Sequence, residues 1–367
     1  MNLAEPSHPA FRIIDRLAGH AQPNTPAEIA AGVFAPQASI SPKYFYDALG
    51  CRLFQAICEL PEYYVTRTEA AVFDLHRDAI AAAVGTHQQL VDLGAGDCQK
   101  AACWFPALDP QRYVAVDVAR GIVESALAEF SAEMPHTEFI GVIDDFSQTL
   151  NLDGVLGDAP VTFFYPGSSI GNFTPDQAAH FMAQTRKYCG QSGSQRSAGS
   201  GNATTGSGNA TTGSGNATTG SGNATTGSGN ATTGSGLLIG VDMVKDSATL
   251  ERAYDDATGV TAAFNKNVLN HINRLAGGNF DPANFRHVGV FNAQLSRIEM
   301  HLEAIEAHSV TLAGRSRSFA RGERIHTENS YKYTPQSFTA LLNRAGFMQV
   351  KLWQDPQAHF AVFFATP

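Results

Sequence analysis

A glycine-rich turn stands between a short apolar run and a helical pattern in the first third of the chain. Leu90-Val91-Asp92-Leu93 is followed by Gly94-Ala95-Gly96, and the segment from Lys100 to Phe105 has a helical composition. Glycines allow positive φ angles and a close approach of the backbone to a ligand, and the helix beyond them presents unpaired N–H groups. A strand, a tight turn and a helix in this order suit nucleotide-like cofactors, although a turn without a ligand gives the same pattern.

Two acidic residues stand at the ends of the next two predicted strands. Asp117 lies near the carboxyl end of the run 113–118, about 20 residues beyond the glycines, where a carboxylate can accept both ribose hydroxyls. Asp145 follows the run 139–142 and precedes Phe146, which suits an adenine, because the carboxylate accepts from the exocyclic amine and the ring stacks. A turn-forming aspartate beside a core phenylalanine explains this second pair equally well. The glycines and Asp117 together predict a βαβ unit that binds an adenosine-bearing cofactor.

Polar and aromatic residues outside this unit are further candidates. The strand 161–165 leads into a Gly/Ser-rich loop, 167–173, and loops at the carboxyl edge of a parallel sheet are where α/β proteins place their chemistry. Asn172 in this loop is therefore a better candidate than an average turn-forming asparagine. Three tyrosines lie in a predicted loop beside prolines and charges: Tyr46, Tyr63 and Tyr64. Packing in the core and binding of a ligand explain them equally well.

The composition bounds the other classes of function. With 367 residues, 43% of them hydrophobic, the chain can bury a large core in one domain or two lobes. The net charge of −9 and the lack of a basic run argue against a nucleic-acid surface. The five cysteines form no CxxC pair, so we expect reduced thiols and no metal site. Since the sequence shows neither a leader pattern nor a long apolar run, we expect a soluble, cytoplasmic protein that binds no membrane. We also expect a monomer.

Periodicity predicts the elements that position these residues. Thr66 and Glu69 indicate a capping box at the start of one helix. We expect the strand 297–304 to pair with 309–312, and the last two strands to pair antiparallel because their connection is short. The further predicted elements are helices over 66–83, 121–134, 250–254, 260–275 and 334–346, and strands over 237–242, 297–304, 309–312, 348–353 and 359–365.

A low-complexity tract interrupts the pattern between a helix and a strand. The sequence Gly-Ser-Gly-Asn-Ala-Thr-Thr occurs five times over residues 199–233 and closes with Gly234-Ser235-Gly236. It contains no apolar residue beyond alanine, so it cannot pack as a coiled coil and should be a flexible tether. A helix-to-strand connection lies at the amino edge of the sheet, away from the ligand crevice. We therefore expect the tract to be functionally silent.

The identity of the cofactor follows from the turn and the terminal strands. NAD-dependent dehydrogenases normally carry a third glycine in G-x-G-x-x-G, and here Gln99 occupies that position. Their sheet is parallel throughout, whereas this chain ends in a predicted antiparallel hairpin. Asp-x-Gly-x-Gly followed by such a hairpin is similar to the S-adenosylmethionine methyltransferases. We therefore predict a class I methyltransferase, an α/β Rossmann-like sheet with a C-terminal antiparallel hairpin.

Seven further segments, in order along the chain, carry a more specific resemblance. The chain resembles the L-histidine Nα-methyltransferase family of ergothioneine biosynthesis over about residues 38–190 and 237–366. The motifs are Lys43-Tyr44-Phe45-Tyr46-Asp47, Leu60-Pro61-Glu62-Tyr63-Tyr64, Gly167-Ser168-Ser169-Ile170-Gly171-Asn172, Arg252-Ala253-Tyr254-Asp255-Asp256, Phe264-Asn265-Lys266-Asn267-Val268-Leu269, Arg297-Ile298-Glu299-Met300 and Ile325-His326-Thr327-Glu328-Asn329-Ser330-Tyr331-Lys332. The repeat tract is the one departure from the family pattern.

The resemblance implies a role for each matching residue. Contacts to S-adenosylmethionine are implied for Tyr63, Gly94, Lys100, Asp117, Asp145 and Phe146. Contacts to L-histidine are implied for Asn172 and Tyr254 at the amino-acid backbone, for Glu328 and Ser330 at the imidazole and for Met300 beside the ring, with Tyr46 near the amine. The residues implied to take part in catalysis are Tyr46, Asn172 and Tyr254. The family also implies repeated transfer, three times, to the trimethylated product hercynine.

The chemistry of the imidazole contacts agrees with the resemblance. Glu328 and Ser330 are two residues apart on a predicted extended segment, so their side chains face one way. A carboxylate can accept one imidazole N–H and a hydroxyl can serve the other nitrogen. A solvated strand carboxylate is the more common role for such a glutamate, and only the resemblance reverses that preference. The alternatives are methylation of another amino acid such as tryptophan, and a non-catalytic S-adenosylmethionine-binding module.

The predicted organisation has four parts. Residues 1–66 form an N-terminal arm and aromatic loop that contributes to the site. The methyltransferase core is expected to comprise 67–190, 237–246 and 334–367, interrupted by the repeat insertion at 191–236. Residues 247–333 are expected to form an inserted α+β lobe that binds the substrate.

Overall fold

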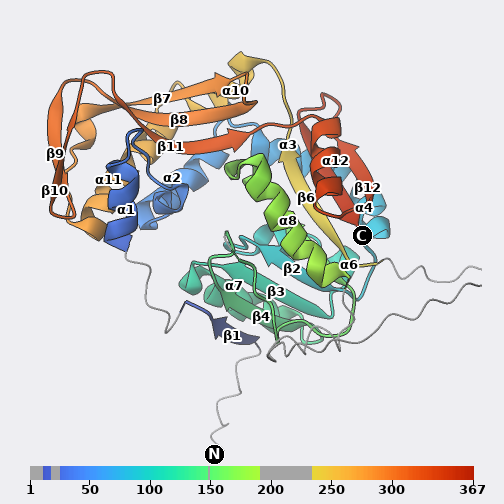
Figure 1. Cartoon of the computed structure of the whole chain (residues 1–367). Coiled ribbons are helices and arrows are strands. Elements are labelled where there is room, and N and C mark those ends of the chain that lie inside the picture. The colour runs from blue at the N-terminus through green and yellow to red at the C-terminus, as the bar shows by residue number, and fades with distance from the viewer. Residues whose placement is uncertain (1–10, 18–24, 148, 191–233) are drawn as a thin grey trace, which may run out of the picture.

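Two sheets of different size meet at the carboxyl end of strand β6 (Gly236–Asp242) in the computed structural model, which describes residues 11–17, 25–147, 149–190 and 234–367. The larger sheet has eight strands and the smaller has three (Figure 1). The segment after β11 (Arg324–Tyr331) joins them, because the Tyr333 N–H donates to the carbonyl of Asp242 at 3.2 Å. The small sheet is therefore bonded directly to the strand end that borders the site.

The eight-stranded sheet has the order β1-β4-β3-β2-β5-β6-β13-β12. Neighbouring strands are parallel from β1 through β6, and the last two pairings are antiparallel. This arrangement confirms the predicted class I methyltransferase sheet with its terminal hairpin. The bounds are β1 Phe11–Asp15, β2 Gln89–Leu93, β3 Arg112–Asp117, β4 Glu138–Ile143, β5 Val161–Tyr165, β12 Gln349–Gln354 and β13 Phe360–Thr366.

The edge strand β1 was not predicted from the sequence. It pairs in parallel with β4, and Ile13 packs so closely on Gly141 that a Cβ at that glycine would lie 2.6 Å from the Ile13 Cδ1. The strand is isolated among prolines and carries Arg12 and Asp15 among its five residues, so its apolar pattern is too weak for periodicity to identify. It adds an eighth strand beside β4.

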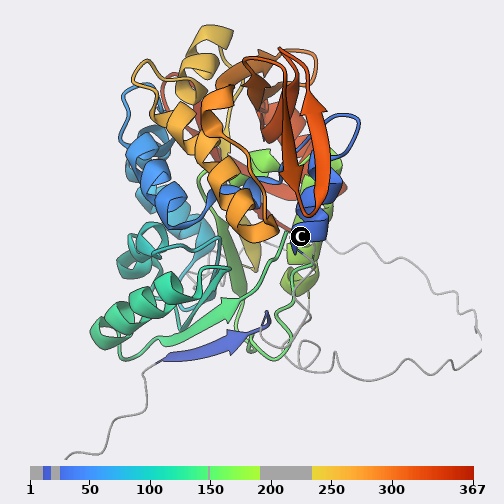
Figure 2. The same ribbon diagram turned by 90° about the vertical axis from the view of Figure 1, so that its left-hand side faces the viewer.

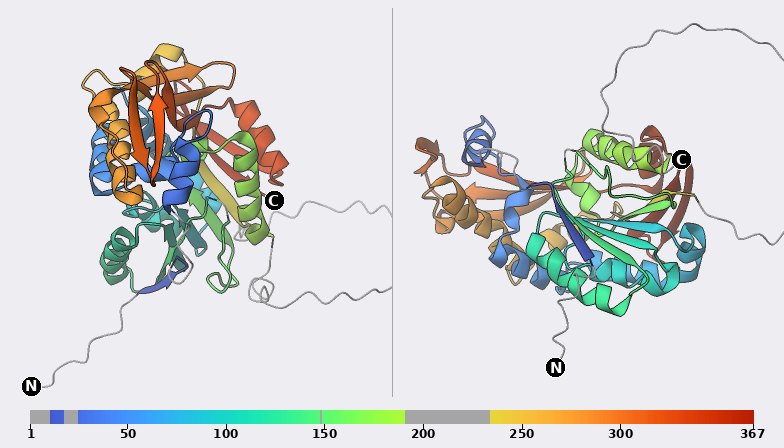
Figure 3. Two further views of the ribbon diagram at one scale, coloured as in Figure 1. Left: turned by 60° about the vertical axis from the view of Figure 1, so that its left-hand side comes forward. Right: turned by 90° about the horizontal axis from the view of Figure 1, so that it is seen from below.

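Helices cover both faces of the large sheet, as Figure 3 shows in its right-hand view. Successive strand residues face opposite sides, so Leu90 and Phe164 belong to one apolar cluster while Val91 and Phe163 belong to the other. The first face carries α3 Val65–Leu75, α4 Arg77–Val84, α5 Gln99–Ala102, α6 Phe105–Leu108 and α7 Arg120–Glu133. The second face carries α8 Pro175–Cys189 and α12 Pro335–Arg344.

The predicted capping box at the start of α3 is wrong. The helix begins at Val65, and its N-cap residue, Tyr64, makes no side-chain capping bond. Glu69 is only 1% exposed and points into the protein, so it cannot serve the helix end. The predicted single helix to residue 83 is also two helices, since His76 separates α3 from α4.

The small sheet has the order β11-β8-β7 and is antiparallel, with β7 Phe285–Asn292 and β8 Arg297–Ala304. The strand predicted at 297–304 is confirmed, but its predicted partner is wrong. Both edges of β8 are occupied by eight-residue strands, while β9 (His308–Leu312) pairs with β10 (Arg315–Phe319). Ala313 and Gly314 both have positive φ, which forms the tight hairpin turn that selects this pairing.

Helices α10 (Ser247–Tyr254) and α11 (Val260–Ala276) flank the small sheet, together with α1 (Thr25–Val33) and α2 (Ala48–Cys58) from the N-terminal arm. In Figure 2 this lobe stands above the core. Within the described residues, no helix has the length and apolar character needed to cross a membrane.

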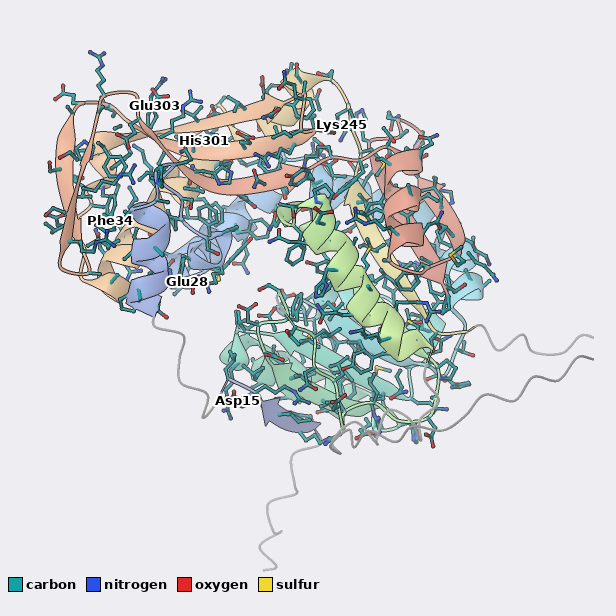
Figure 4. All side chains as sticks on the ribbon, viewed as in Figure 1. Asp15, Glu28, Phe34, Lys245, His301 and Glu303 are labelled. Carbon is teal, nitrogen blue, oxygen red and sulfur yellow. The ribbon has the colours of Figure 1, made fainter. Side chains whose placement is uncertain are left out.

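The N-terminal arm is bonded to the far edge of β11. The His326 N–H donates to the Ala38 carbonyl and the Ile40 N–H donates to the His326 carbonyl, both at 2.9 Å. Arg315 of the β9–β10 hairpin stacks over the ring of Phe34 at 4.1 Å, at the position marked in Figure 4. These contacts hold the N-terminal arm against the small sheet.

The residues that flank the repeat tract lie at the amino edge of the large sheet. The chain leaves α8 at Cys189 and re-enters at Ser235, whose hydroxyl accepts the N–H of Val161 at the start of β5. Gly236, expected to belong to the tether, is therefore the first residue of β6, and Ser235 bonds to the sheet through its side chain. The predicted flexible tether otherwise falls on residues 191–233, which lie outside the residues that the structure describes.

Candidate active site

The glycine turn lies at the carboxyl edge of the large sheet, between β2 and α5. Gly94 and Gly96 have φ angles of +71° and +53°, and a Cβ at Gly96 would meet nothing within 4 Å. The Asp117 carboxylate at the end of β3 accepts the Gly96 N–H at 2.9 Å, which holds the acid against the turn. Phe146 lies on the other side, with its Cζ 3.8 Å from the Cβ position of Gly94. An open backbone turn between a carboxylate and an aromatic ring fits a nucleoside group.

Asp145 stands beside this turn, just beyond the end of β4. One of its oxygens accepts the Ser147 N–H at 3.1 Å, while the Phe146 ring packs on Phe181 and Tyr165 with centroid distances of 5.7 and 6.1 Å. The observed geometry is thus compatible with both alternatives drawn from the sequence, an adenine site and a turn-forming aspartate beside a core phenylalanine. The predicted cofactor residues Gly94, Asp117, Asp145 and Phe146 thus all lie at the carboxyl edge of the large sheet.

Asp92 of the glycine motif is buried below the turn. Its carboxylate accepts the Tyr113 hydroxyl at 2.7 Å, and burial raises its pKa to about 7 despite this hydrogen bond. Asp92 was part of the predicted motif but was not predicted to have a site role. Its position inside the strand makes it a support for the turn rather than a ligand contact.

Lys100 and Glu69 connect the cofactor turn to the loop after β5. The Lys100 Nζ lies 2.7 Å from one Glu69 oxygen, and the other oxygen accepts the Gly167 N–H at 2.6 Å. Burial works to lower the pKa of Lys100, but the Glu69 carboxylate outweighs it and leaves that pKa raised. Sequence reasoning missed Glu69, because its spacing from Thr66 imitates a capping box.

One cavity between the small sheet and the core brings the predicted substrate residues together. Its walls come from the segment 46–63, the loop after β5, α10, α11, β8 and β11. The predicted residues that line it are Tyr46, Tyr63, Asn172, Tyr254, Met300, Glu328 and Ser330. Gly167 also lines it, so the cavity and the glycine turn adjoin through the Gly167–Glu69–Lys100 contacts.

Glu328 projects into this cavity beside a β-bulge. It pairs with Met300 across the β8–β11 ladder, and the register shifts between His326 and Glu328. Such bulges re-aim side chains next to active sites. Asn172 donates to the Glu328 Oε1 at 3.2 Å and to the Asn329 carbonyl at 3.1 Å, in the amide orientation that satisfies both acceptors. Burial raises the pKa of Glu328 to about 7, while Lys332 acts to lower it.

Tyr254 and Ser330 form a hydrogen-bonded pair of hydroxyls on the same wall. Their oxygens are 2.8 Å apart, and the Lys332 Nζ lies 2.9 Å from each of them. Lys332 was quoted only within the motif 325–332 and was not predicted as a site residue. A lysine after a strand normally lies in solvent, so nothing in the sequence marked this one as buried.

Aromatic rings complete the cavity. Tyr46 is 44% exposed, and its ring packs edge-on against Phe54 and Phe264 at 5.8 and 6.0 Å. Tyr63 is buried and packs edge-on against Tyr254 at 6.0 Å. Of the three tyrosines whose roles the sequence left open, Tyr46 and Tyr63 line the cavity, whereas the hydroxyl of Tyr64 donates to Asp242.

The sheet order, the glycine turn and the adjoining polar cavity define the chain as an S-adenosylmethionine-dependent methyltransferase of class I. A family model described as histidine-specific, S-adenosylmethionine-dependent methyltransferase matches residues 25–196 and 215–367. The chain therefore belongs to this family, as the sequence resemblance implied.

Named relatives agree with the family model. The histidine N-alpha-methyltransferase of Mycolicibacterium smegmatis is 36% identical over 345 residues, and that of Mycobacterium tuberculosis is 32% identical over 345 residues. Each alignment covers 92% of this chain and 94% of the relative. Ergothioneine biosynthesis protein 1 of Neurospora crassa is 25% identical over 322 residues, which cover 84% of this chain and 31% of that protein.

Proposed function

We propose that the protein transfers methyl groups from S-adenosylmethionine to the α-amino nitrogen of L-histidine, three times, to give hercynine. The observation that carries this proposal is the convergence of Glu328, Ser330, Asn172 and Tyr254 in one cavity that adjoins the glycine turn. The first two groups match the two nitrogens of an imidazole, and the other two match the polar end of an amino acid. Family membership supports the same substrate.

We propose that the residues expected from the sequence to contact S-adenosylmethionine do so in the following way. Asp117 would accept the ribose hydroxyls and Asp145 the adenine amine, with Phe146 against the base and Gly94 below it. Lys100 and Tyr63 would hold the amino-acid end, since both lie toward the cavity side of the turn. S-adenosylmethionine supplies an electrophilic methyl group on its sulfonium sulfur when it is bound.

The acceptor site would orient histidine by its two ends. Glu328 accepts one imidazole N–H, Ser330 donates to the other nitrogen, and Met300 packs beside the ring. Asn172 and Tyr254 hold the backbone end, with Tyr46 near the amine. A polar site of this kind discriminates strongly, because a ligand without the matching groups leaves buried partners unpaired.

The reaction needs the α-nitrogen unprotonated. Among the described residues that line the cavity, Glu328 is the single carboxylate, and it faces the ring end. Positioning therefore supplies most of the proposed acceleration, and the amine, with a pKa of about 8, loses its proton to water. The product becomes a quaternary cation, which the faces of Tyr46, Tyr63 and Phe264 can stabilise.

We also propose the organisation expected from the sequence, with residues 67–190, 237–246 and 334–367 as the core, 247–333 as the substrate lobe and 1–66 as an arm that closes the site. A cytoplasmic monomer that uses no metal is proposed as well. All five cysteines are free, which fits a reducing compartment.

Incubation of the purified protein with S-adenosylmethionine and a panel of amino acids, read by mass spectrometry, tests the proposal. Gains of one, two and three methyl groups on histidine alone are expected. Methylation of tryptophan instead would favour the first alternative. Binding of S-adenosylmethionine without methylation of any amine would favour a non-catalytic module.

A further inference from the structure

Lys332 is a fully buried cation directly behind the substrate cavity. Its side chain is 0% exposed and lies outside the cavity lining, yet its Nζ contacts two lining hydroxyls, those of Tyr254 and Ser330. The third neighbour of the Nζ is the Asp242 carboxylate at 2.6 Å. An ammonium has three N–H donors and no acceptor. All three protons are thus directed at named oxygens.

A count of the hydroxyl protons shows how Lys332 orients the hydrogen bonds of the Tyr254 and Ser330 hydroxyls. Tyr254 and Ser330 each accept from Lys332, and they share one hydrogen bond at 2.8 Å. The pair has two hydroxyl protons, one of which fills the shared bond. One proton therefore remains, on Ser330 when Tyr254 donates the shared bond, and because the lysine side is closed to it, that proton is free to point into the cavity that both residues line. The wall presents a hydrogen-bond donor, and a ligand must offer an acceptor there.

We propose that Lys332 is the specificity-determining positioning residue of the acceptor site: it polarises the Tyr254–Ser330 pair as a donor and so selects a ring with an unprotonated nitrogen facing Ser330. This inference rests on the proposed function. With Glu328 as acceptor on the other ring nitrogen, the site then fits the neutral imidazole in one tautomer. An apolar ring, which has no lone pair, leaves the hydroxyl proton unpaired.

The anchor of Lys332 provides a matched control. Asp242 is fully buried and binds two cations, Lys332 and Lys245, at 2.6 Å each. Lys245 contacts Tyr64 and the Met243 carbonyl rather than the hydroxyl pair, and Figure 4 marks it at the junction of lobe and core. Replacing either lysine removes one buried charge and leaves the carboxylate paired with the other, which should preserve folding.

The test compares Lys332→Met, Lys332→Arg and Lys245→Met with the wild-type enzyme. Kinetics for L-histidine and calorimetric binding of L-histidine, β-(2-thienyl)-L-alanine and S-adenosylmethionine are measured for each. In Lys332→Met we expect the KM for histidine to rise about tenfold with kcat changed by less than about threefold, and cofactor affinity unchanged. Thienylalanine, which has no ring nitrogen, should lose no affinity in any variant, and Lys245→Met should keep the wild-type KM.

A double-mutant cycle separates positioning from general destabilisation. In a Ser330→Ala/Tyr254→Phe background, the effect of Lys332→Met on histidine affinity should vanish, because the groups it polarises are gone. Lys332→Arg keeps the charge but not the tetrahedral donor geometry, and should restore only part of the histidine affinity. If Lys332→Met does not fold, Lys332→Arg carries the test, with a loss of about threefold expected for histidine and none for thienylalanine.

Equal losses in Lys332→Met and Lys245→Met, or an equal loss for both ligands, would overturn the inference. So would additive effects in the cycle. A wild-type protein that fails to methylate histidine would instead overturn the proposed function, so the two failures are distinguishable.

Discussion

Glu69 and Lys100 form an ion pair of 2.7 Å that joins helix α3 to the helix after the glycine turn. The second oxygen of Glu69 accepts the N–H of Gly167, which begins the loop that carries Asn172. A Cβ at Gly240 would lie 2.2 Å from the same oxygen, so the carboxylate lies directly on strand β6. One buried side chain thus fixes the position of the glycine turn relative to the loop after β5.

Replacing Glu69 should therefore weaken cofactor binding and substrate binding together. Glu69→Gln keeps an acceptor for Gly167 but loses the charge opposite Lys100, and we expect a several-fold rise in the Kd for S-adenosylmethionine. Glu69→Ala loses both contacts and should also reduce the free energy of unfolding by about 2 kcal/mol. Calorimetry and urea denaturation measure the two effects. Unchanged cofactor affinity in both variants would show that the pair has no role in binding.

The ionisation of Glu328 should appear in the pH dependence of the reaction. Burial raises its pKa to about 7, so below that pH it is protonated and cannot accept the imidazole N–H. We expect kcat/KM for histidine to fall below pH 7, and Glu328→Gln, which does not titrate, to lack this limb. The limb from the substrate amine, near pH 8, should remain in both proteins. Glu328→Ala should lower histidine affinity far more than cofactor affinity.

Tyr254 and Ser330 should be energetically coupled in substrate binding. Their hydroxyls share a hydrogen bond of 2.8 Å and the same lysine donor, and groups in one network do not contribute additively. A cycle of Tyr254→Phe, Ser330→Ala and the double variant should give a coupling of about 1 kcal/mol for histidine binding. Tyr63→Phe with Ser330→Ala is the control pair, for which near-additive effects are expected.

Asp92 should make the folded protein less stable as the pH rises. Its pKa is raised by burial from 3.8 to about 7, so between those values the unfolded chain has lost the proton that the folded chain still holds. Stability from this group is therefore present below about pH 4 and is lost as the pH rises to 7. Asp92→Asn removes this loss and should gain up to about 4 kcal/mol at pH 8, at about 1.4 kcal/mol per pKa unit. Denaturation at pH 5 and 8 measures it, and an equal gain at both would contradict the assignment.

Local patterns predicted the elements on which the core depends, because strands β2 to β6 and the terminal hairpin are mainly apolar runs bounded by turn residues. The partners of β8 could not be predicted from local patterns, since β7 and β11 take its two edges and the next strand, β9, pairs with β10 instead. The turn at Ala313 and Gly314 that diverts β9 lacks the usual Asn-Gly signal.

The site residues also divide into those that local sequence patterns predict and those that they do not. The placement of Gly94 and Asp117 at one turn was predictable because it follows from local backbone chemistry. Glu328 needed the family resemblance, because a strand glutamate is usually solvated. Glu69 and Lys332 could not be predicted as buried groups, since each depends on partners that are remote in the sequence, Gly167 and Asp242.

The repeat tract should be removable without effect on the reaction. Its flanks, Cys189 and Ser235, lie at the amino edge of the sheet, opposite the strand ends that carry the site. Deleting the 35 residues 199–233 shortens the connection 190–235 from 46 to 11 residues. If the tract is the unstructured tether that its composition predicts, each halving of a loop stabilises folding by about 0.6 kcal/mol, so two halvings should add about 1 kcal/mol. We expect unchanged kcat and KM for histidine with a slightly higher Tm. A deletion that extends into Ser235 serves as the control, because losing its hydrogen bond to Val161 should reverse the gain in stability. A lower kcat in the tract deletion itself would show that the repeats act on the site.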